Sequence, residues 1–197
     1  SRPGVFDVVP TAAPGIEDIL VLGKVKQLER SDAYDLILLD GPAAGHAIPF
    51  LQAARGLLDA VNMGPIQAQA RDVAELLGDP ARCQVMLVTL AEETPVNELV
   101  ETSYALEDRV GVALTPVVVN ALYPELEFGE LPAGPLADAA AFRSERCAHQ
   151  RLQLARLADA LPLPQLALPI VFTAALDADD VDGLAGELLA ALELAPT

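Results

Sequence analysis

The hydrophobic positions of this chain follow two patterns that succeed each other along the sequence. Short continuous apolar runs predict buried strands, whereas apolar residues that recur every three or four positions predict helices with one apolar face. Alternation of the two patterns is typical of an α/β domain built on a mostly parallel sheet. We therefore expect a single α/β domain over residues 1–197, with a three-layer arrangement in which helices flank the sheet.

The residues that break regular structure between these runs set the bounds of the expected helices and strands. Proline and glycine mark several ends, and the clearest stop is Gly78-Asp79-Pro80. Thr94 is expected to be the N-cap of a helix that has Pro95 at its first position. The expected strands cover 6–9, 36–39, 84–90, 115–120 and 166–172, and the expected helices cover 14–30, 48–60, 66–77, 95–110, 136–161 and 179–192.

One apolar run ends in a carboxylate. Residues 36–39 are all leucine or isoleucine, which predicts a strand covered on both faces, and Asp40 follows them directly. Open parallel sheets bind ligands at the carboxyl ends of their strands. Gly41, Pro42 and Gly45 then predict a loop without regular structure. Asp40 is therefore a candidate for holding Mg²⁺ beside a nucleotide, and the alternative is that it caps the following helix.

Residues 40–51, Asp-Gly-Pro-Ala-Ala-Gly-His-Ala-Ile-Pro-Phe-Leu, resemble the switch II segment of the ArsA family of ATPases. This family includes the arsenite-pump ATPase and the guided-entry ATPase for tail-anchored membrane proteins. Three further segments, 14–18, 90–98 and 117–122, resemble family segments in the same order along the chain. The resemblance covers about residues 14 to 125, and its motifs are specific in combination and weak singly.

The resemblance implies a P-loop NTPase fold and assigns roles to particular residues. Asp40 would hold Mg²⁺ of Mg-ATP through water. The segment with Gly41, Pro42, Gly45 and His46 would sense the γ-phosphate, with His46 as a coupling residue rather than a general base. For His46 the structural alternative is a hydrogen bond that braces the loop. The family pattern has threonines and an arginine where this chain has Ala44, Ala47 and Pro49, so some of its coupling groups are absent.

Two downstream residues also match family positions. Asn120, at a predicted strand end, corresponds to the asparagine that reads adenine, and its alternative role is to cap a turn. Glu98 corresponds to a glutamate near the partner subunit. Glu92 and Glu93 lie in a first helical turn, where the helix dipole favours acids, so a structural role is the simpler interpretation for them.

A phosphate-binding loop is missing from these 197 residues. That loop needs Gly-x-x-x-x-Gly-Lys-Ser/Thr, and the only two lysines, Lys24 and Lys26, do not fit the pattern. In the family, the loop and the switch I segment precede the region that this chain resembles. We therefore expect the chain to be the C-terminal part of an ArsA-like ATPase, without nucleotide turnover of its own.

The amino-acid composition limits the kinds of partner that this chain is expected to bind. With 29 acidic and 12 basic residues the net charge is −17, which argues against nucleic acid and anionic membrane surfaces. No apolar run reaches the length of a membrane span. Cys83 and Cys147 lie far apart in sequence, and we expect a reducing cytoplasmic setting. Family members work as pairs, so a homodimer or a paired paralogous subunit is expected, together with an anion or protein client.

Two other functions stay open at this point. A non-catalytic scaffold or regulatory subunit would keep the same fold and partner face without a phosphate-binding loop. An unrelated α/β domain that uses Asp40 to bind a polar small molecule is the third interpretation. The residues preceding this segment in the parent gene would separate the first two.

Overall fold

The computed structural model describes residues 15–61 and 63–194. The chain divides into two compact units, one formed by Ser1–Gln84 with Tyr104–Ala113 and the other by Val85–Ser103 with Leu114–Thr197. We call them the helical unit and the sheet unit after their contents. The strand expected over residues 6–9 lies outside the described residues.

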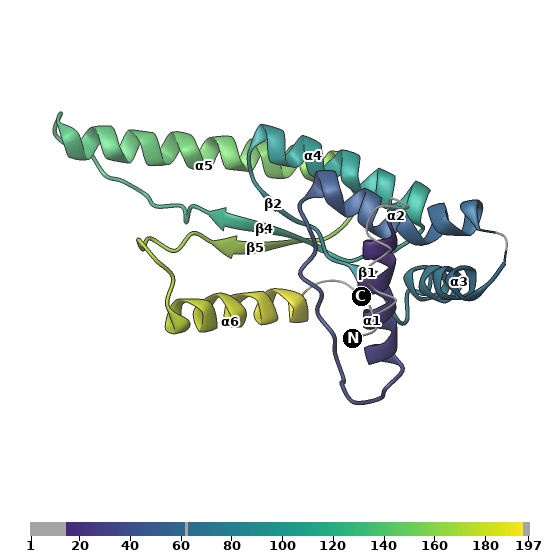
Figure 1. The fold of residues 1–197 in the computed structure, drawn as a ribbon. Helices are drawn as coiled ribbons and strands as arrows, with labels where there is room; N and C mark the ends of the chain where they lie inside the picture. The colour runs from purple at the N-terminus through teal and green to yellow at the C-terminus, as the bar shows by residue number, and fades with distance from the viewer. Residues whose placement is uncertain (1–14, 62, 195–197) are drawn as a thin grey trace, which may run out of the picture. The chain divides into compact units, whose positions relative to one another are not determined.

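The helical unit is built from three α-helices and a short π-helix (Figure 1), namely α1 (Ile16–Glu29), α2 (Ala44–Ala60), α3 (Pro65–Leu77) and η2 (Leu106–Val110). Gly64, with φ of 106°, precedes α3, and Pro65 occupies its first position because a proline there loses no helical hydrogen bond. The helices bury one apolar face each, and their buried apolar residues are Ile19, Leu22, Ala54, Leu57, Ala70, Val73, Leu76, Leu77, Leu106 and Val110. The helices expected here are confirmed, although α2 begins four residues before its predicted start.

The strand expected at residues 36–39 does not form, and this prediction was wrong. Residues 36–43 have no regular structure, and Leu36 and Leu38 are 73% and 85% exposed. The physical reason is the absence of a neighbour: no strand in the described part of the chain pairs with this segment. A lone extended segment leaves its backbone N–H and C=O groups to water, so it gains nothing from adopting strand geometry.

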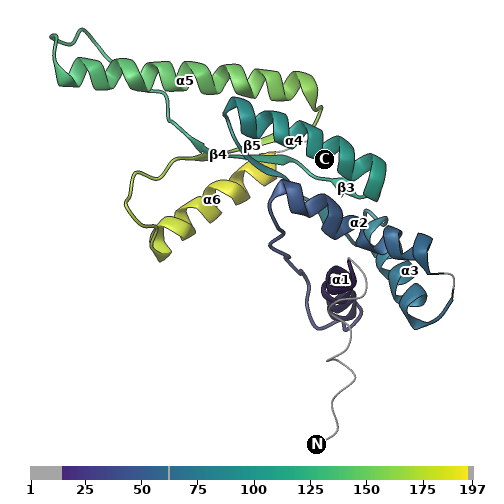
Figure 2. The same ribbon diagram turned by 45° about the horizontal axis from the view of Figure 1, so that its top comes forward.

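The sheet unit contains the parallel sheet that the sequence predicts. Its strands β2 (Val88–Leu90), β4 (Val117–Leu122) and β5 (Gln165–Pro169) pair in the order β2-β4-β5. In both views α4 (Glu93–Ala105) and α5 (Pro135–Ala160) lie on one face and α6 (Ala178–Leu194) lies on the other (Figures 1 and 2). This unit therefore shows the three layers of an α/β fold. A further two-stranded sheet joins β1 (Gln84–Val85) and β3 (Ala113–Leu114).

The core of the sheet unit lies between β4 and the helices α4 and α5. Val117 and Val119 of β4 point into it because alternate residues of a strand face the same side. This central strand has a neighbour on each edge and a helical layer on each face (Figure 2). The buried residues of this cluster are Ala91, Val96, Leu99, Val117, Val119, Leu157 and Leu161.

Two expectations for the sheet unit need correction. The strand expected over 84–90 is split into β1 and β2, and Val88 and Leu90 are exposed. The edge position of β2 explains this, because α6 packs against β5 and leaves that side of β2 uncovered. The helix expected to be capped by Thr94 begins at Glu93, and the N–H of Val96 donates to the carbonyl of Glu92.

Candidate functional site

Asp40 lies in the irregular segment that leads into α2. Its side chain is exposed, and it forms no hydrogen bond or ion pair with any residue that the structure describes. The N-cap of α2 is Ala43, and no side chain caps this helix end. The structural alternative for Asp40, that it caps the following helix, is therefore not what the structure shows. What remains is a solvent-facing carboxylate, the kind of oxygen ligand that Mg²⁺ and its bound waters prefer.

The residues that follow Asp40 leave space around the backbone. A Cβ built on Gly41 or Gly45 would meet no described atom within 4 Å, so packing within the helical unit does not demand glycine at either position. Backbone without side chains allows close approach of a ligand. The loop predicted around Gly45 is shorter than expected, because α2 begins at Ala44 and places Gly45 and His46 in its first turn.

His46 is exposed in that first turn of α2. Its backbone N–H donates to the carbonyl of Ala43 at 2.8 Å, and the N–H of Ala47 donates to the same carbonyl at 3.0 Å. No hydrogen bond of the imidazole is seen among the described residues, so the bracing role considered for this side chain has no support here. The first turn of an uncapped helix keeps N–H groups free to bind a negatively charged group.

Asn120 lies in β4 of the sheet unit, opposite Leu90 of β2. Its Oδ1 accepts a hydrogen bond from the N–H of Ala121 at 2.8 Å. This local bond is the kind expected of an asparagine that shapes a strand end. For the side-chain amide nitrogen, no partner is seen in the described residues, so a donor and part of an acceptor stay available for a base edge.

The glutamates after β2 have separate environments. Glu92 accepts a hydrogen bond from Arg146 Nη2 at 2.9 Å, which supports the structural role expected for it. Glu93 is the first residue of α4, and Glu98 is exposed five residues further along this helix. Within residues 15–61 and 63–194, no group of three or more His, Cys, Asp or Glu side chains is arranged to hold a metal ion directly.

The structure also brings together residues that the sequence did not single out. Tyr123 follows β4, and its ring meets that of Phe172 edge-on with the centroids 5.6 Å apart. The Arg143 guanidinium lies 5.8 Å from the Tyr123 centroid and 5.3 Å from that of Phe172, while Arg146 lies 5.7 Å from Tyr123. These cation–π contacts tie α5 to the segments that follow β4 and β5. The spacing of the two arginines, three residues apart on one helix, was the only signal in the sequence.

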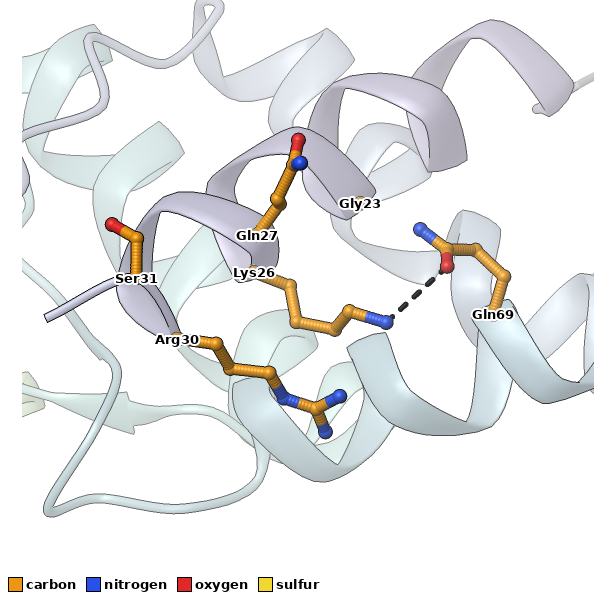
Figure 3. A pocket seen from close by; sticks show the side chains of 6 residues that line it. All are labelled: Gly23, Lys26, Gln27, Arg30, Ser31 and Gln69. Atoms are coloured by element: carbon orange, nitrogen blue, oxygen red, sulfur yellow. Dashed lines mark hydrogen bonds between the residues drawn. The ribbon is translucent and has the colours of Figure 1, made fainter.

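A hollow of about 600 Å³ opens in the helical unit (Figure 3). Lys26 Nζ donates to Asp72 Oδ2 at 2.7 Å and to Gln69 Oε1 at 3.2 Å, and Arg30 reaches the same Asp72 oxygen at 3.3 Å. The hydrogen bond from Lys26 holds the pKa of the Asp72 carboxyl below its usual value. Lys26 therefore ties α1 to α3. The lining residues are Gly23, Lys26, Gln27, Arg30, Ser31 and Gln69.

Neither cysteine forms a disulfide. Cys83 is half-buried, and this burial raises the pKa of its thiol. Cys147 is buried, and its thiol contacts the carbonyl of Tyr123 at 3.7 Å. Both therefore act as small packing groups. Among the described helices, none is both long enough and apolar enough to cross a bilayer.

Known proteins are similar to this chain over the Asp40 segment and well beyond it. A model of the anion-transporting ATPase family matches residues 4–64. ATPase BagA of Mycobacterium tuberculosis is 30% identical over 203 residues, which cover 86% of this chain and 59% of that protein. A provisionally named ATPase of Mycobacterium bovis gives the same values.

A more distant relative extends the comparison to another lineage. A Halobacterium salinarum protein, provisionally named an arsenical pump-driving ATPase, is 26% identical over 166 residues. The match covers 80% of this chain and 24% of that protein, so the chain spans less than two thirds of the length of each of these relatives. The family match around Asp40 and the similarity to these ATPases support an ArsA-type ATPase family for this chain.

Proposed function

We propose that this chain is part of a Mg²⁺-dependent ATPase that couples ATP hydrolysis to the handling of an anion or a protein client. The observation that carries the proposal is the state of Asp40: it is exposed, unpaired among the described residues, and not the cap of α2. Asp40 is thus free to take a ligand, and it differs from other exposed acids of this chain because it stands at the aspartate of the switch II pattern, within the residues that the family model matches.

The residues present fit Mg-ATP in three respects. Asp40 offers a carboxylate that would hold the metal through water. Gly41 and Gly45 leave open backbone before and within the first turn of α2. Pro42 lies between them, and His46 in that turn would respond to the γ-phosphate. Asn120 offers a side-chain amide to adenine. The bound metal would neutralise charge on the phosphate oxygens during transfer.

An ATPase of this kind also needs a lysine that binds the phosphates of ATP. Neither lysine fits that role, because Lys26 is buried and paired with Asp72, and Lys24 donates to Gln27 at 3.0 Å. We therefore place the phosphate-binding loop in another part of an intact ATPase, meaning the longer protein that we propose contains this chain. In that protein, residues 36–39 would pair with a neighbouring strand, which would cover Leu36 and Leu38.

The partners of such an ATPase follow from charge and exposure. A net charge of −17 disfavours nucleic acid. The two unpaired cysteines fit a reducing cytoplasm, and the family resemblance is the ground for pairing with a second copy or a paralogous subunit. Glu98 is exposed on α4 and is free to contact that partner. The Halobacterium relative is named for driving an arsenical pump, which makes an anion client one of the two options.

Replacement of Asp40 with Asn in the intact ATPase tests the proposal. This change keeps the shape and removes the charge, so ATP turnover should fall about a hundredfold or more. The matched control is Asp35→Asn, because Asp35 is an exposed acid of the same irregular segment. If Asp40→Asn retains turnover within about threefold of the unmodified ATPase, Asp40 does not act on the metal. If the unmodified protein shows no turnover at all, the scaffold function is correct instead.

A further inference from the structure

The carboxyl end of β4 has an unusual backbone. The register between β4 and β5 shifts between Val119 and Leu122, and Ala121 has φ of +58°. Left-handed backbone is strained for any residue with a Cβ and persists only where surrounding contacts impose it. Asn120 stands immediately before this point. The contacts that impose the bend therefore decide the direction of the Asn120 side chain.

Gln150 of α5 supplies two of these contacts. Its side chain is buried, with 5% of the residue exposed. Its Oε1 accepts from the N–H of Tyr123 at 2.9 Å, and its Nε2 donates to the carbonyl of Ala121 at 3.2 Å. One amide thus holds two backbone groups on either side of Leu122. Both partners are backbone groups of half-buried residues, so loss of this side chain would leave them without these hydrogen bonds.

The bend is linked to Asn120 by a third hydrogen bond. The N–H of Ala121 donates to Asn120 Oδ1 at 2.8 Å, so the orientation of the Asn120 amide depends on the conformation of Ala121. A side-chain amide distinguishes base edges only if its donor and acceptor are held in a fixed orientation. The three bonds form a chain from α5 to Asn120.

We propose that Gln150 is a positioning residue that sets base preference through Asn120. The inference rests on the proposed role of Asn120 in reading adenine. Gln150 itself touches no base in this account. It keeps Ala121 in the left-handed conformation, and Ala121 in turn keeps the Asn120 amide in place.

A double-mutant cycle in the intact ATPase separates this role from simple stabilisation. The variants are Asn120→Ala, Gln150→Leu and the pair, and the readout is the equilibrium affinity for ADP and GDP, which needs no turnover. We expect Asn120→Ala to weaken ADP binding about 10- to 100-fold, and Gln150→Leu to weaken it about tenfold, with little change for GDP. In the Asn120→Ala background, Gln150→Leu should change ADP binding by less than about twofold.

Gln153→Leu is the matched control. Gln153 is a buried glutamine of the same helix whose side-chain amide bonds to Arg156 and His149 rather than to β4. Its loss should leave the ratio of ADP to GDP affinity unchanged even if it lowers stability. Should Gln150→Leu fail to fold, Gln150→Glu replaces it, because Glu keeps the shape and the acceptor for Tyr123 and loses the donor to Ala121.

The outcomes separate the role proposed for Gln150 from the role proposed for Asn120. If Asn120→Ala leaves the ADP to GDP ratio unchanged, Asn120 does not read the base, and both fail. If Asn120→Ala lowers the ratio but the Gln150 variants do not, only the role of Gln150 is wrong. An equal loss of ADP and GDP affinity in the Gln150 variants, or a full effect that persists without the Asn120 amide, also overturns it.

Discussion

Residues 36–40 and strand β4 share one sequence pattern and have different structures. Leu36–Leu39 precede Asp40, and Val117–Val119 precede Asn120, so each is an apolar run that ends in a polar side chain. Val119 is fully buried between β2 and β5, whereas Leu38 is 85% exposed and pairs with no strand in the described part of the chain. An apolar run therefore shows that a strand needs neighbours, but it does not show that they are present.

The largest expected effect comes from one polar substitution in each run. Val119→Asn should destabilise the chain by about 3–5 kcal/mol, because it removes buried apolar surface and buries an unpaired amide. Leu38→Asn should change stability by less than about 0.5 kcal/mol, because its side chain is already in water. Urea denaturation of both variants measures the two values.

The same pair of variants in the intact ATPase sharpens the comparison. There we expect Leu38→Asn to cost about as much as Val119→Asn, because a neighbouring strand would cover residues 36–39. A small effect of Leu38→Asn in both proteins would mean that the run stays exposed and that the proposed pairing is wrong.

The second prediction concerns ligand binding by residues 1–197 alone. Because the sequence contains no phosphate-binding loop and Lys26 is paired with Asp72, we expect Mg-ATP to bind more weakly than the low micromolar range. Calorimetric titration measures this directly. A dissociation constant near 1 μM, equivalent to about 8 kcal/mol, would show that this chain carries its own phosphate site.

A smaller effect is expected at the strained end of β4. Ala121→Gly should raise stability by about 0.5 kcal/mol, because glycine adopts φ of +58° without strain but loses more entropy on folding. The matched control is Ala113→Gly in β3, which has no positive φ and should lose stability. Destabilisation by Ala121→Gly would mean that the left-handed conformation carries little strain.

The smallest effect is the pH dependence of the helical unit. The pKa of Asp72 is lowered by Lys26 and that of Glu29 by Arg82, so both carboxylates stabilise the fold above their unfolded pKa values near 4. This contribution is lost as the pH falls through the lower, folded values. Asp72→Asn should lower the melting temperature at about pH 7 and match the unmodified chain near pH 2.

The control for this prediction is Asp59→Asn, because Asp59 is an exposed acid of α2 without an ion pair among the described residues. It should leave the melting temperature unchanged at both pH values. A constant difference between Asp72→Asn and the unmodified chain across this range would show that the pair with Lys26 does not respond to protonation.

Local signals explain the parts of the fold that the sequence predicted. Helices α3, α5 and α6 begin and end within about two residues of their expected bounds, because proline and glycine act within a few residues. The errors at 36–39 and 84–90 concern strands, whose formation and burial depend on partners far away in the sequence. No property of Leu38 or Val88 could reveal whether a partner covers it.

The residues of the candidate site also fall into those that the sequence singled out and those that it missed. Asp40 stood out because it ends an apolar run, and Asn120 stood out because it matches a family asparagine; the roles of both stay predictions. Gln150 gave no signal, because a glutamine inside a helix is ordinary until its contacts with Ala121 and Tyr123 are known. Arg143 was missed for the same reason.

The central claim is that residues 36–39 form a strand only when a neighbouring strand pairs with them, and that this strand places Asp40 beside the nucleotide. Amide hydrogen exchange of residues 36–46 tests this claim most directly. We predict that the amides of 36–39 exchange freely in the chain alone and are protected in the intact ATPase. Mg-ATP should then slow exchange at 41–46 in the intact ATPase. Free exchange of 36–39 in both proteins, with no change at 41–46 on adding Mg-ATP, would contradict the account.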